Sequence, residues 1–420
     1  MQRTSALILA LSLVLAVCGR DDSSGDARTT SAVTPAPSTS SSTTSTAAAS
    51  TTTEPALADV RTDIEGADEV MATTIAQVYA QALNPGQDAV IELPTGLIRQ
   101  YRDNTTQPGP VTISGSVHTG RILDTDIAVF TNVDDVVLLA GEPGAQAGAA
   151  DAWQVVGAKL AGLGEAAWYG DGPRLVLVLG SDARPGQRVT GFRADSVHIV
   201  GSVPATGQGS IVGIPRDSWV DASYGGRSKL TNTMASRGPE VVLETVQALT
   251  GLELEGYLVT GFAGFEDLID GFGGFTIDVP YGMSDSKSNA YFRTGVQEFD
   301  GADALAFSRN RTDTPRGDFG RSFNHGVVML AVMPEVQSMG IDELPRLLEL
   351  LTAFVLTDLS ASDLLAISAA AYELDPEQVT NIVAPGRVGS TSGGASVVFL
   401  QEAAFELFAD ISDGVVDGDY

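Results

Sequence analysis

A run of five apolar residues, Leu175-Val-Leu-Val-Leu179, constrains the fold of this chain more than any other feature. A run without polar alternation is typical of a strand that is buried on both faces. It ends in Gly-Ser-Asp182-Ala-Arg184, and Arg193-Ala-Asp195-Ser follows shortly afterwards. In open α/β sheets, ligands bind beyond the carboxyl ends of the strands. The acids and arginines delivered there could hold a divalent cation and an anionic phosphate together.

From residue 170 onward, strands and helices alternate, which predicts an α/β layered fold. The predicted strands span residues 175–179, 196–203, 210–214, 257–260 and 275–279. The predicted helices span residues 239–249, 263–272, 319–336, 341–355, 361–372 and 395–410. We take residues 170–411 as the catalytic domain and expect the acidic tail, residues 412–420, to be frayed.

Residues 61–169 form an accessory α+β region of unknown role that precedes this domain. Helices are predicted at residues 67–82 and 152–168, and strands at 89–93, 111–117, 122–133 and 136–140. This region contains no phosphate-cradling glycine loop and no cluster of metal ligands.

The first 18 residues read as an export signal, with Arg3 before an apolar stretch that is too short to be a permanent membrane span. Leu15-Ala-Val17-Cys18 resembles a bacterial lipobox, which implies lipidation of Cys18, although Val17 stands where a small residue is usual. An uncleaved anchor and simple secretion are the alternatives. All three place the protein outside the cytoplasm, at the outer face of the bacterial cell membrane or in the cell wall. Residues 19–60, rich in Ser, Thr, Ala and Pro, predict a flexible linker with a reach on the order of 35 Å.

The charge of the chain restricts its partners. A formal net charge of −29 argues against nonspecific binding to nucleic acid. Lys159, Lys229 and Lys287 are the only lysines, and many of the arginines lie between residues 174 and 321. Arginine forms bidentate contacts with phosphate, so this concentration indicates anion binding, with ordinary Arg–Asp ion pairs as the alternative.

Three clusters of charged residues stand at predicted strand ends. The first consists of Asp182, Arg184, Arg193 and Asp195, and the second is Ile-Pro-Arg216-Asp217-Ser. The third is Ser-Arg309-Asn-Arg311-Thr-Asp, followed by Gly-Asp318-Phe-Gly-Arg321. If the third stretch is extended, Arg309 and Arg311 point to the same side.

Together these motifs resemble those of the LytR-CpsA-Psr family of bacterial cell-wall ligases, in family order, over residues 172–409. The resemblance implies a central mixed β-sheet flanked by helices, with a hydrophobic tunnel for a polyprenyl chain. It also implies a phosphotransferase that moves a glycopolymer from a polyprenyl-pyrophosphate carrier onto peptidoglycan and releases polyprenyl phosphate. Carriers of teichoic acid, capsule and arabinogalactan fit the motifs equally well.

The resemblance assigns roles to individual residues. Asp182 and Asp195 would coordinate Mg²⁺, and Asp195 and Asp318 would also belong to the catalytic set. Asp217 and Asp318 would orient arginines. The arginines that would bind the pyrophosphate and stabilise its developing charge are Arg184, Arg193, Arg216, Arg309, Arg311 and Arg321.

The sequence departs from the family pattern after Arg321. Where the family commonly has Arg-Gln-Gln, this chain has Asn324-His325-Gly326. Asn324 and His325 are still expected to bind phosphate by hydrogen bonds. His325 as a proton carrier is the alternative.

Apolar helical stripes fit either the walls of the tunnel or an ordinary core. Their residues are Val241, Val242, Val246, Leu268, Ile269, Phe272, Val327, Val328, Leu330 and Val332. Two further functions compete with the transferase: a polyprenyl-pyrophosphate hydrolase, and an inactive lipoprotein that binds polyprenyl phosphate or the cell wall.

Overall fold

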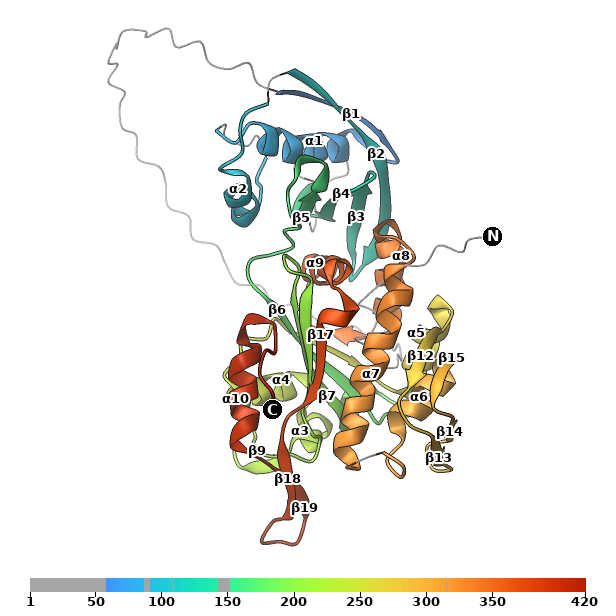
Figure 1. Ribbon diagram of the computed structural model, residues 1–420. Helices are drawn as coiled ribbons and strands as arrows, with labels where there is room; N and C mark the ends of the chain where they lie inside the picture. The colour runs from blue at the N-terminus through green and yellow to red at the C-terminus, as the bar shows by residue number, and fades with distance from the viewer. Residues whose placement is uncertain (1–57, 87–90, 108, 143–151, 315) are drawn as a thin grey trace, which may run out of the picture.

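The computed structural model describes residues 58–86, 91–107, 109–142, 152–314 and 316–420. The predicted export signal with Cys18, and nearly all of the predicted linker, lie outside these residues. Figure 1 shows an upper unit built on a five-stranded sheet and a lower unit built on a six-stranded sheet.

The six-stranded sheet is mixed, which confirms the predicted α/β class. Its strand order is β16-β11-β6-β7-β8-β17. β11 runs parallel to β6 and β17 parallel to β8, whereas β6–β7, β7–β8 and β11–β16 are antiparallel pairs. The strands are β6 (Arg174–Ser181), β7 (Ala194–Val203), β8 (Gln208–Gly213), β11 (Tyr257–Thr260), β16 (Leu356–Thr357) and β17 (Val379–Val383).

Helices cover both faces of this sheet, as the apolar run in β6 predicts. Leu175, Leu177 and Leu179 belong to one core cluster, and Val176 and Val178 belong to another, because successive side chains point to opposite faces. The first face packs against α3 (Leu230–Arg237), α4 (Pro239–Thr250) and α10 (Glu402–Asp410). The second packs against α5 (Phe262–Phe272), α6 (Gly301–Arg309), α7 (Asp318–Gln337), α8 (Leu344–Phe354) and α9 (Ala361–Ala370).

Four two-stranded ribbons and several 3₁₀ turns complete the lower unit among the described residues. The ribbons are β9 (Trp219–Asp221) with β10 (Arg227–Lys229), β12 (Phe275–Val279) with β15 (Gly295–Phe299), β13 (Met283–Asp285) with β14 (Ala290–Phe292), and β18 (Gly386–Ser390) with β19 (Ser396–Leu400). The turns are Val189–Gly191, Ile341–Glu343, Ala371–Glu373, Pro376–Gln378 and Ile411–Asp413, and Ala161–Leu163 lies in the upper unit.

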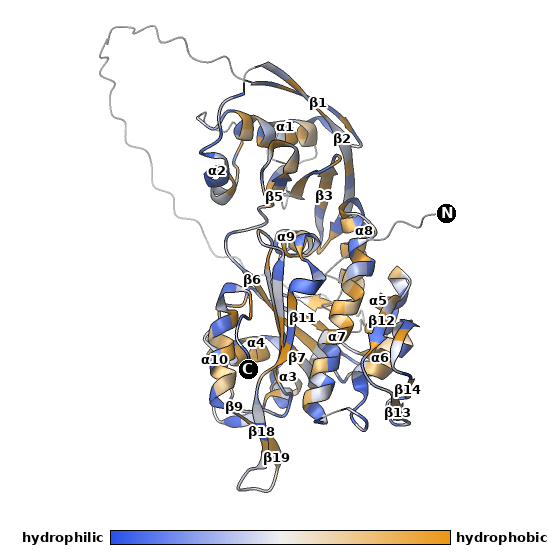
Figure 2. Ribbon diagram, in the orientation of Figure 1, coloured by the Kyte–Doolittle hydropathy of each residue, from blue (hydrophilic) through white to orange (hydrophobic). Residues whose placement is uncertain are grey.

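The five-stranded sheet of the accessory region shares a core with the lower unit. Ile127 and Val129 of β3 (Thr125–Thr131) point into the core that contains α8 and α9, while Ala128 and Phe130 point toward α1 (Glu69–Leu83) and α2 (Thr95–Tyr101). Figure 2 shows the apolar strands of this sheet above α8 and α9. Its elements are β1 (Ala58–Glu65), α1 (Glu69–Leu83), α2 (Thr95–Tyr101), β2 (Gly109–Ile122), β3 (Thr125–Thr131), β4 (Asp135–Gly141) and β5 (Trp153–Leu160).

The structure corrects the prediction of a helix at residues 152–168. Residues 153–160 form β5, because this segment pairs along β4 and alternates buried and partly exposed side chains. Residues 395–410 were likewise predicted as one helix, but residues 396–400 form β19 and α10 begins only at Glu402. The predicted strand at 122–133 is interrupted by a turn, where Leu123 and Asp124 have positive φ.

Two smaller predictions are also wrong. Residues 91–93 of the expected strand at 89–93 are not a strand, and residues 89–90 lie outside the described part of the chain. The acidic tail is not frayed, because Val416 is buried and the N–H groups of Asp417 and Gly418 both donate to Asp410. Within the residues described, no helix combines the length and apolar character that a membrane span requires.

Candidate active site

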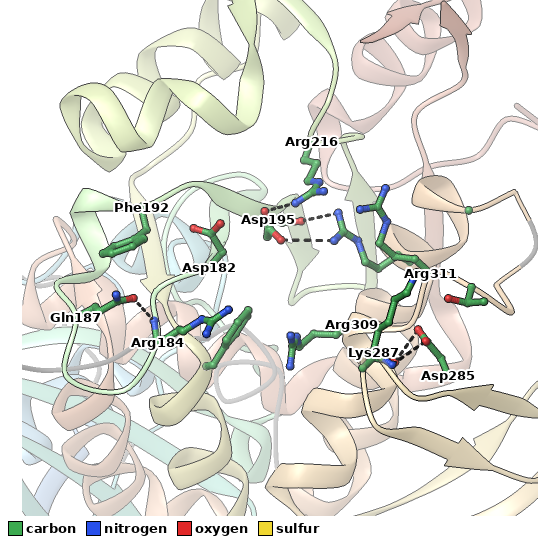
Figure 3. A pocket seen from close by; sticks show the side chains of 15 residues that line it. Asp182, Arg184, Gln187, Phe192, Asp195, Arg216, Asp285, Lys287, Arg309 and Arg311 are labelled. Atoms are coloured by element: carbon green, nitrogen blue, oxygen red, sulfur yellow. Dashed lines mark hydrogen bonds and ion pairs between the residues drawn. The ribbon is translucent and has the colours of Figure 1, made fainter. Parts of the chain in front are cut away.

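Asp182, Asp195 and most of the predicted arginines line one cavity of about 700 Å³. Asp182 follows β6, and Asp195 is the second residue of β7. The two strands are antiparallel, with Ser181 opposite Ala194, so the end of one meets the start of the other. The N–H of Arg193 donates to the Asp182 carboxylate at 2.8 Å and fixes this corner. Figure 3 shows Asp182 and Asp195 on the wall of the cavity, across from Arg309.

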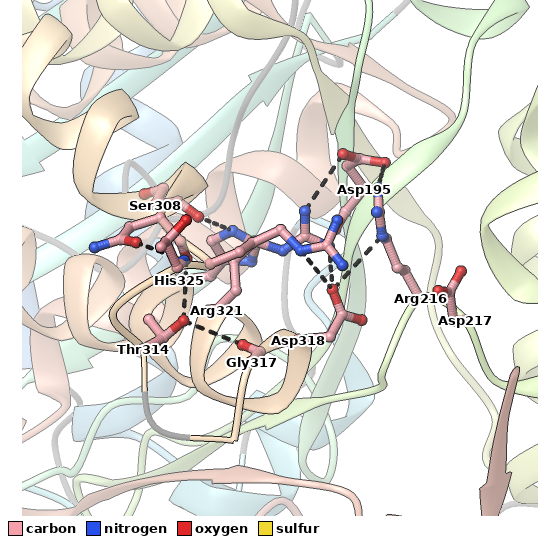
Figure 4. A network of polar contacts seen from close by, with 12 residues as sticks. Asp195, Arg216, Asp217, Ser308, Thr314, Gly317, Asp318, Arg321 and His325 are labelled. Carbon is pink, nitrogen blue, oxygen red and sulfur yellow. Dashed lines mark hydrogen bonds and ion pairs between the residues drawn. The ribbon is translucent and has the colours of Figure 1, made fainter. Parts of the chain in front are cut away.

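Two acids and two arginines form a partly buried ion-pair network at the back of the cavity (Figure 4). Asp195 accepts a hydrogen bond from Arg216 and lies 3.5 Å from Arg321 Nη1. Asp318, in the first turn of α7, accepts from Arg321 Nη2 at 2.7 Å and lies 3.7 Å from Arg216 Nε. Each acid therefore contacts both arginines, which holds the four side chains in one arrangement.

Burial and ion pairing act in opposite directions on these arginines. Burial lowers the pKa of Arg321, and the attraction of Asp318 only partly offsets it. For Arg216, burial would also lower the pKa, but Asp195 and Asp318 together outweigh it and the pKa is raised. Both guanidinium groups remain charged at neutral pH because arginine starts from a pKa above 12.

Three other cations of the cavity have no ion-pair partner among the described residues. They are Arg184, Lys287 and Arg309, and all three are exposed. The Arg309 guanidinium lies over the ring of Phe262, 4.6 Å from its centroid. Arg311 is only weakly paired, because its Nε lies 3.8 Å from the Asp318 carboxylate. These unpaired cations face the cavity and are free to bind an anion.

The donor set of the cavity fits a magnesium ion held jointly by protein and substrate. Asp182 and Asp195 line the cavity, and Asp318 Oδ2 is a buried oxygen without a hydrogen-bond partner. Over the described ranges, no group of three or more His, Cys, Asp or Glu residues could hold a metal by itself. Mg²⁺ commonly binds through one or two carboxylates, with water and substrate phosphates completing its shell.

Two buried histidines lie beneath the network, and their hydrogen bonds fix their tautomers. A carbonyl oxygen only accepts, so Nε2 of His325 carries the proton that is donated to Ser308 O at 2.8 Å. His198 Nε2 donates in the same way to Ser322 O, which leaves its Nδ1 to accept from the Ser196 hydroxyl. Burial lowers the pKa of His198 to about 4 and that of His325 well below its usual range, so both are neutral at pH 7.

Comparison with known sequences places the chain in a family. The LytR_cpsA_psr family model matches residues 158–411, which is more than half of the chain. The chain belongs to the LytR_cpsA_psr family.

Several curated proteins are similar to this chain. The chain is 32% identical over 176 residues to "Probable cell wall biosynthesis protein LcpB" of Corynebacterium glutamicum, covering 39% of this chain and 42% of that protein. It is 32% identical over 162 residues to "Polyisoprenyl-teichoic acid--peptidoglycan teichoic acid transferase TagU" of Bacillus cereus, covering 38% of this chain and 52% of that protein. The chain thus spans about half the length of these relatives. The crystal structure of Bacillus subtilis TagV has the same fold, with 23% identity, a TM-score of 0.51 and coverage of 60% of this chain and 100% of that one.

Several residues predicted from the LytR_cpsA_psr motifs line the cavity. They are Asp182, Arg184, Asp195, Arg216, Arg309, Arg311 and Arg321. Asp318 does not line the cavity, but its carboxylate lies within 3.8 Å of Arg216, Arg311 and Arg321. Arg309 is the last residue of α6 and not part of an extended stretch as expected. The extended conformation begins at Asn310, and this still brings Arg309 and Arg311 to the same cavity.

Besides Asp318 and His325, three predicted residues do not line the cavity. Arg193 is exposed, and its contact with Asp182 is made through its backbone. Asp217 was expected to orient an arginine, but its ion pair, at 3.0 Å, is with Lys229 of β10. Asn324 is fully buried and accepts a hydrogen bond from the Tyr281 hydroxyl, so its carbonyl oxygen is committed away from phosphate.

His325 lines a small inner cavity that adjoins the main one. The inner cavity has a volume of about 30 Å³ and shares Asp195, Phe262, Arg309 and Arg321 with the main cavity. His325 Nδ1 is buried and has no hydrogen-bond partner. The structure therefore places His325 behind the arginines, and not at the front with the phosphate-facing groups.

The residues expected to wall a tunnel do not form one set. Val242 and Val246 of α4 pack on the face of the sheet opposite to Leu268, Ile269 and the α7 residues. The α4 residues therefore belong to an ordinary core. The residues of α5 and α7 lie in the core on the other face of the sheet.

Sequence reasoning missed the part of the cavity that the β13–β14 hairpin supplies. Asp285, Lys287 and Ser288 of this hairpin line the cavity. The pKa of the Asp285 carboxyl is lowered, mainly because the backbone N–H of Lys287 donates a hydrogen bond to it. Burial opposes this shift and the hydrogen bond from the Ser288 hydroxyl adds to it, so Asp285 stays ionised. Lys287 is one of only three lysines in the chain, and this rarity was the signal that could have drawn attention to it.

Proposed function

We propose that this protein transfers a glycopolymer from a polyprenyl-pyrophosphate carrier onto peptidoglycan and releases polyprenyl phosphate. Membership of the LytR_cpsA_psr family and the names of relatives that act on polyisoprenyl-linked teichoic acid support this proposal. The observation that carries it is the concentration of cations in one cavity of a chain whose net charge is −29.

The division between paired and unpaired cations suits a diphosphate ligand. Arg216 and Arg321 are fixed by Asp195 and Asp318, so they form a rigid positive wall. The unpaired cations, Arg184, Lys287 and Arg309, supply the charge that neutralises the substrate. Preorganised donors of this kind stabilise developing charge without reorganisation during the reaction.

The reaction is an in-line displacement at the sugar-side phosphorus. A hydroxyl oxygen of the acceptor forms a bond to this phosphorus, and the bond from phosphorus to the bridging oxygen breaks. The electron pair leaves on the bridging oxygen as polyprenyl phosphate, where the arginines stabilise it. The proton of the hydroxyl passes to a carboxylate of the cavity. Asp182 suits this role better than Asp195, because Asp195 already contacts two arginines whereas Asp182 accepts only one backbone N–H.

Asp182 and Asp195 would hold Mg²⁺ in this site. A bound Mg²⁺ would neutralise phosphate charge and increase the electrophilicity of the phosphorus. We further propose that the lipidated Cys18 anchors the protein at the outer face of the membrane. There the polyprenyl carrier and the peptidoglycan acceptor are both within reach of the linker.

The test uses the purified protein with a short-chain polyprenyl-pyrophosphate-linked sugar, with and without peptidoglycan. The transferase releases polyprenyl phosphate in the presence of Mg²⁺ and attaches the labelled sugar to peptidoglycan, and EDTA stops both. Release of polyprenyl phosphate with only free sugar phosphate as the second product would show a hydrolase.

Variants separate these enzymes from a binding protein. Asp195→Ala and Arg309→Ala should nearly abolish turnover. Donor binding without turnover in the wild-type protein would show a lipoprotein that only binds its ligand, and would refute the proposed activity.

A further inference from the structure

We propose that a second, aromatic groove binds the glycan strand of the acceptor. This groove, called the aromatic groove below, lies between β9, α4, β19 and α10 and has a volume of about 340 Å³. The identity of the acceptor rests on the proposed function, whereas the groove itself rests on geometry. Its surface is formed by Trp219, Leu249, Phe399, Leu400 and Phe405, with Asp221 and Arg227 at the rim.

The groove gathers aromatic side chains that remain accessible. Phe405 is 48% exposed, and Trp219 and Phe399 are only partly buried. Aromatic residues make up only 6% of the chain, so three aromatic side chains around one groove are more than this composition would place there by chance. Its volume falls in the range of small-molecule sites, which are mostly apolar with a few placed polar groups.

The rim supplies those polar groups in a fixed orientation. Arg227 Nη2 donates to the Trp219 carbonyl oxygen at 2.9 Å, and its Nε lies 3.4 Å from Asp221. The Arg227 guanidinium also lies 5.9 Å from the centroid of the Trp219 ring. The carboxylate of Asp221 is 85% exposed, so it can accept hydrogen bonds from a ligand.

This combination matches a sugar better than a membrane. A pyranose ring has an apolar C–H face that stacks on an aromatic ring, and hydroxyl groups at its edge that bind a guanidinium and a carboxylate. An anionic membrane would instead be repelled by an exposed acid at the rim and by the net charge of −29.

The groove lies close to the cavity in which the acceptor hydroxyl reacts. Trp219 follows Arg216 by three residues, so their Cα atoms are at most about 11 Å apart. The N–H of Val398 in β19 donates to the carbonyl oxygen of Asp217, which ties the groove wall to this segment. The β18–β19 hairpin projects beside these residues at the lower end of the molecule (Figure 1).

The other strand of this hairpin approaches the helix that carries the ion-pair network. A Cβ atom on Gly386 of β18 would lie only 3.3 Å from the ring of Phe319, in the first turn of α7. The base of the hairpin thus stands between the groove and the turn that bears Asp318 and Arg321. A glycan strand held in the groove would need to cross only this base to present a hydroxyl to the cavity.

The experiment measures binding of the full chain to peptidoglycan glycan strands that lack stem peptides, without any donor present. Trp219→Ala and Phe405→Ala are each expected to weaken binding at least tenfold. Tyr291→Ala, which removes a ring that is 59% exposed on β14, is the matched control and should bind like the wild type. Because Phe405 is half exposed, its replacement should leave the Tm unchanged even if replacement of Trp219 disturbs the fold.

Two results would overturn the proposal. One is wild-type glycan binding by a folded Phe405→Ala protein. The other is selective loss of binding to phosphatidylglycerol vesicles, with glycan binding retained, which would mark a membrane contact. Failure of the proposed function is a separate outcome, because it would show as absent turnover of the donor while this binding assay still decides the groove.

Discussion

Replacement of a paired arginine and of an unpaired arginine should have different consequences for stability. Arg309 is exposed and has no ion-pair partner among the described residues, and its one contact of note is with the ring of Phe262. An exposed cation–π contact contributes about 0.5–1 kcal/mol. At roughly 2–4 °C per kcal/mol, Arg309→Ala should lower the Tm by no more than about 4 °C.

Arg321→Ala should behave differently because its side chain is only 7% exposed and lies between Asp195 and Asp318. Removal of one partner from a buried ion pair costs about 3–5 kcal/mol, since the remaining charge is left uncompensated. By the same conversion the Tm should fall by about 6–20 °C. Both variants should lose about 10²–10³-fold in turnover, because each removes a cation from the diphosphate site.

The assay pairs thermal unfolding, followed by circular dichroism, with release of polyprenyl phosphate at 25 °C. Arg293→Ala, a surface arginine that does not line the cavity, is the matched control and should change neither value. Equal loss of stability in the Arg309 and Arg321 variants would contradict the division into structural and substrate-facing cations. So would an Arg309→Ala protein with unchanged turnover.

Three further predictions test other parts of the molecule. Lys287→Ala should raise KM about fivefold with kcat retained, since an exposed charge contact is worth about 1 kcal/mol, and Lys287→Arg should restore KM; a purely structural lysine would leave KM unchanged. The contribution of His198 to stability should fall by about 3 kcal/mol as the pH drops from 6.5 to 4, because the unfolded chain protonates His198 in this window and the folded chain largely does not, and buried His325 acts in the same direction. Urea unfolding at each pH checks this, and a stability that does not fall over the window would contradict a neutral, buried His198. Leu138→Ala should cost about 2–5 kcal/mol through a cavity in the core shared by the two units, whereas Val133→Ala, at a turn residue that is 95% exposed, should cost almost nothing; similar Tm values for the two variants would speak against a shared core.

The elements that sequence predicted well are those whose signal is local. The strands β6, β7 and β8 are apolar on both faces, so their composition identifies them without knowledge of their neighbours. β5 and β19 were predicted as parts of helices because their strand character depends on pairing with β4 and β18. Pairing across the chain is a tertiary effect that overrides local propensity.

The site shows the same division. The charged motifs identify the residues that converge, but the reasons differ: Asp182, Asp195 and Arg216 stand at strand ends, whereas Arg309 ends α6 and Arg321 lies at the start of α7. The motifs do not identify ion-pair partners that lie on a two-stranded ribbon. Lys229 reaches Asp217 only because β10 folds back on β9. Likewise, the α4 and α5 stripes look equivalent in sequence, and only the order of the strands puts them on opposite faces of the sheet.

The core that joins the two units affects the order in which the chain can fold. The lower face of the accessory sheet, with Val129 and Leu138, is covered by α8 and α9, which are made roughly two hundred residues later. A newly made N-terminal half can close its upper face against α1 but leaves the other face exposed to solvent. Late arrival of these helices makes the nascent protein dependent on protection against aggregation until its C-terminal third has emerged.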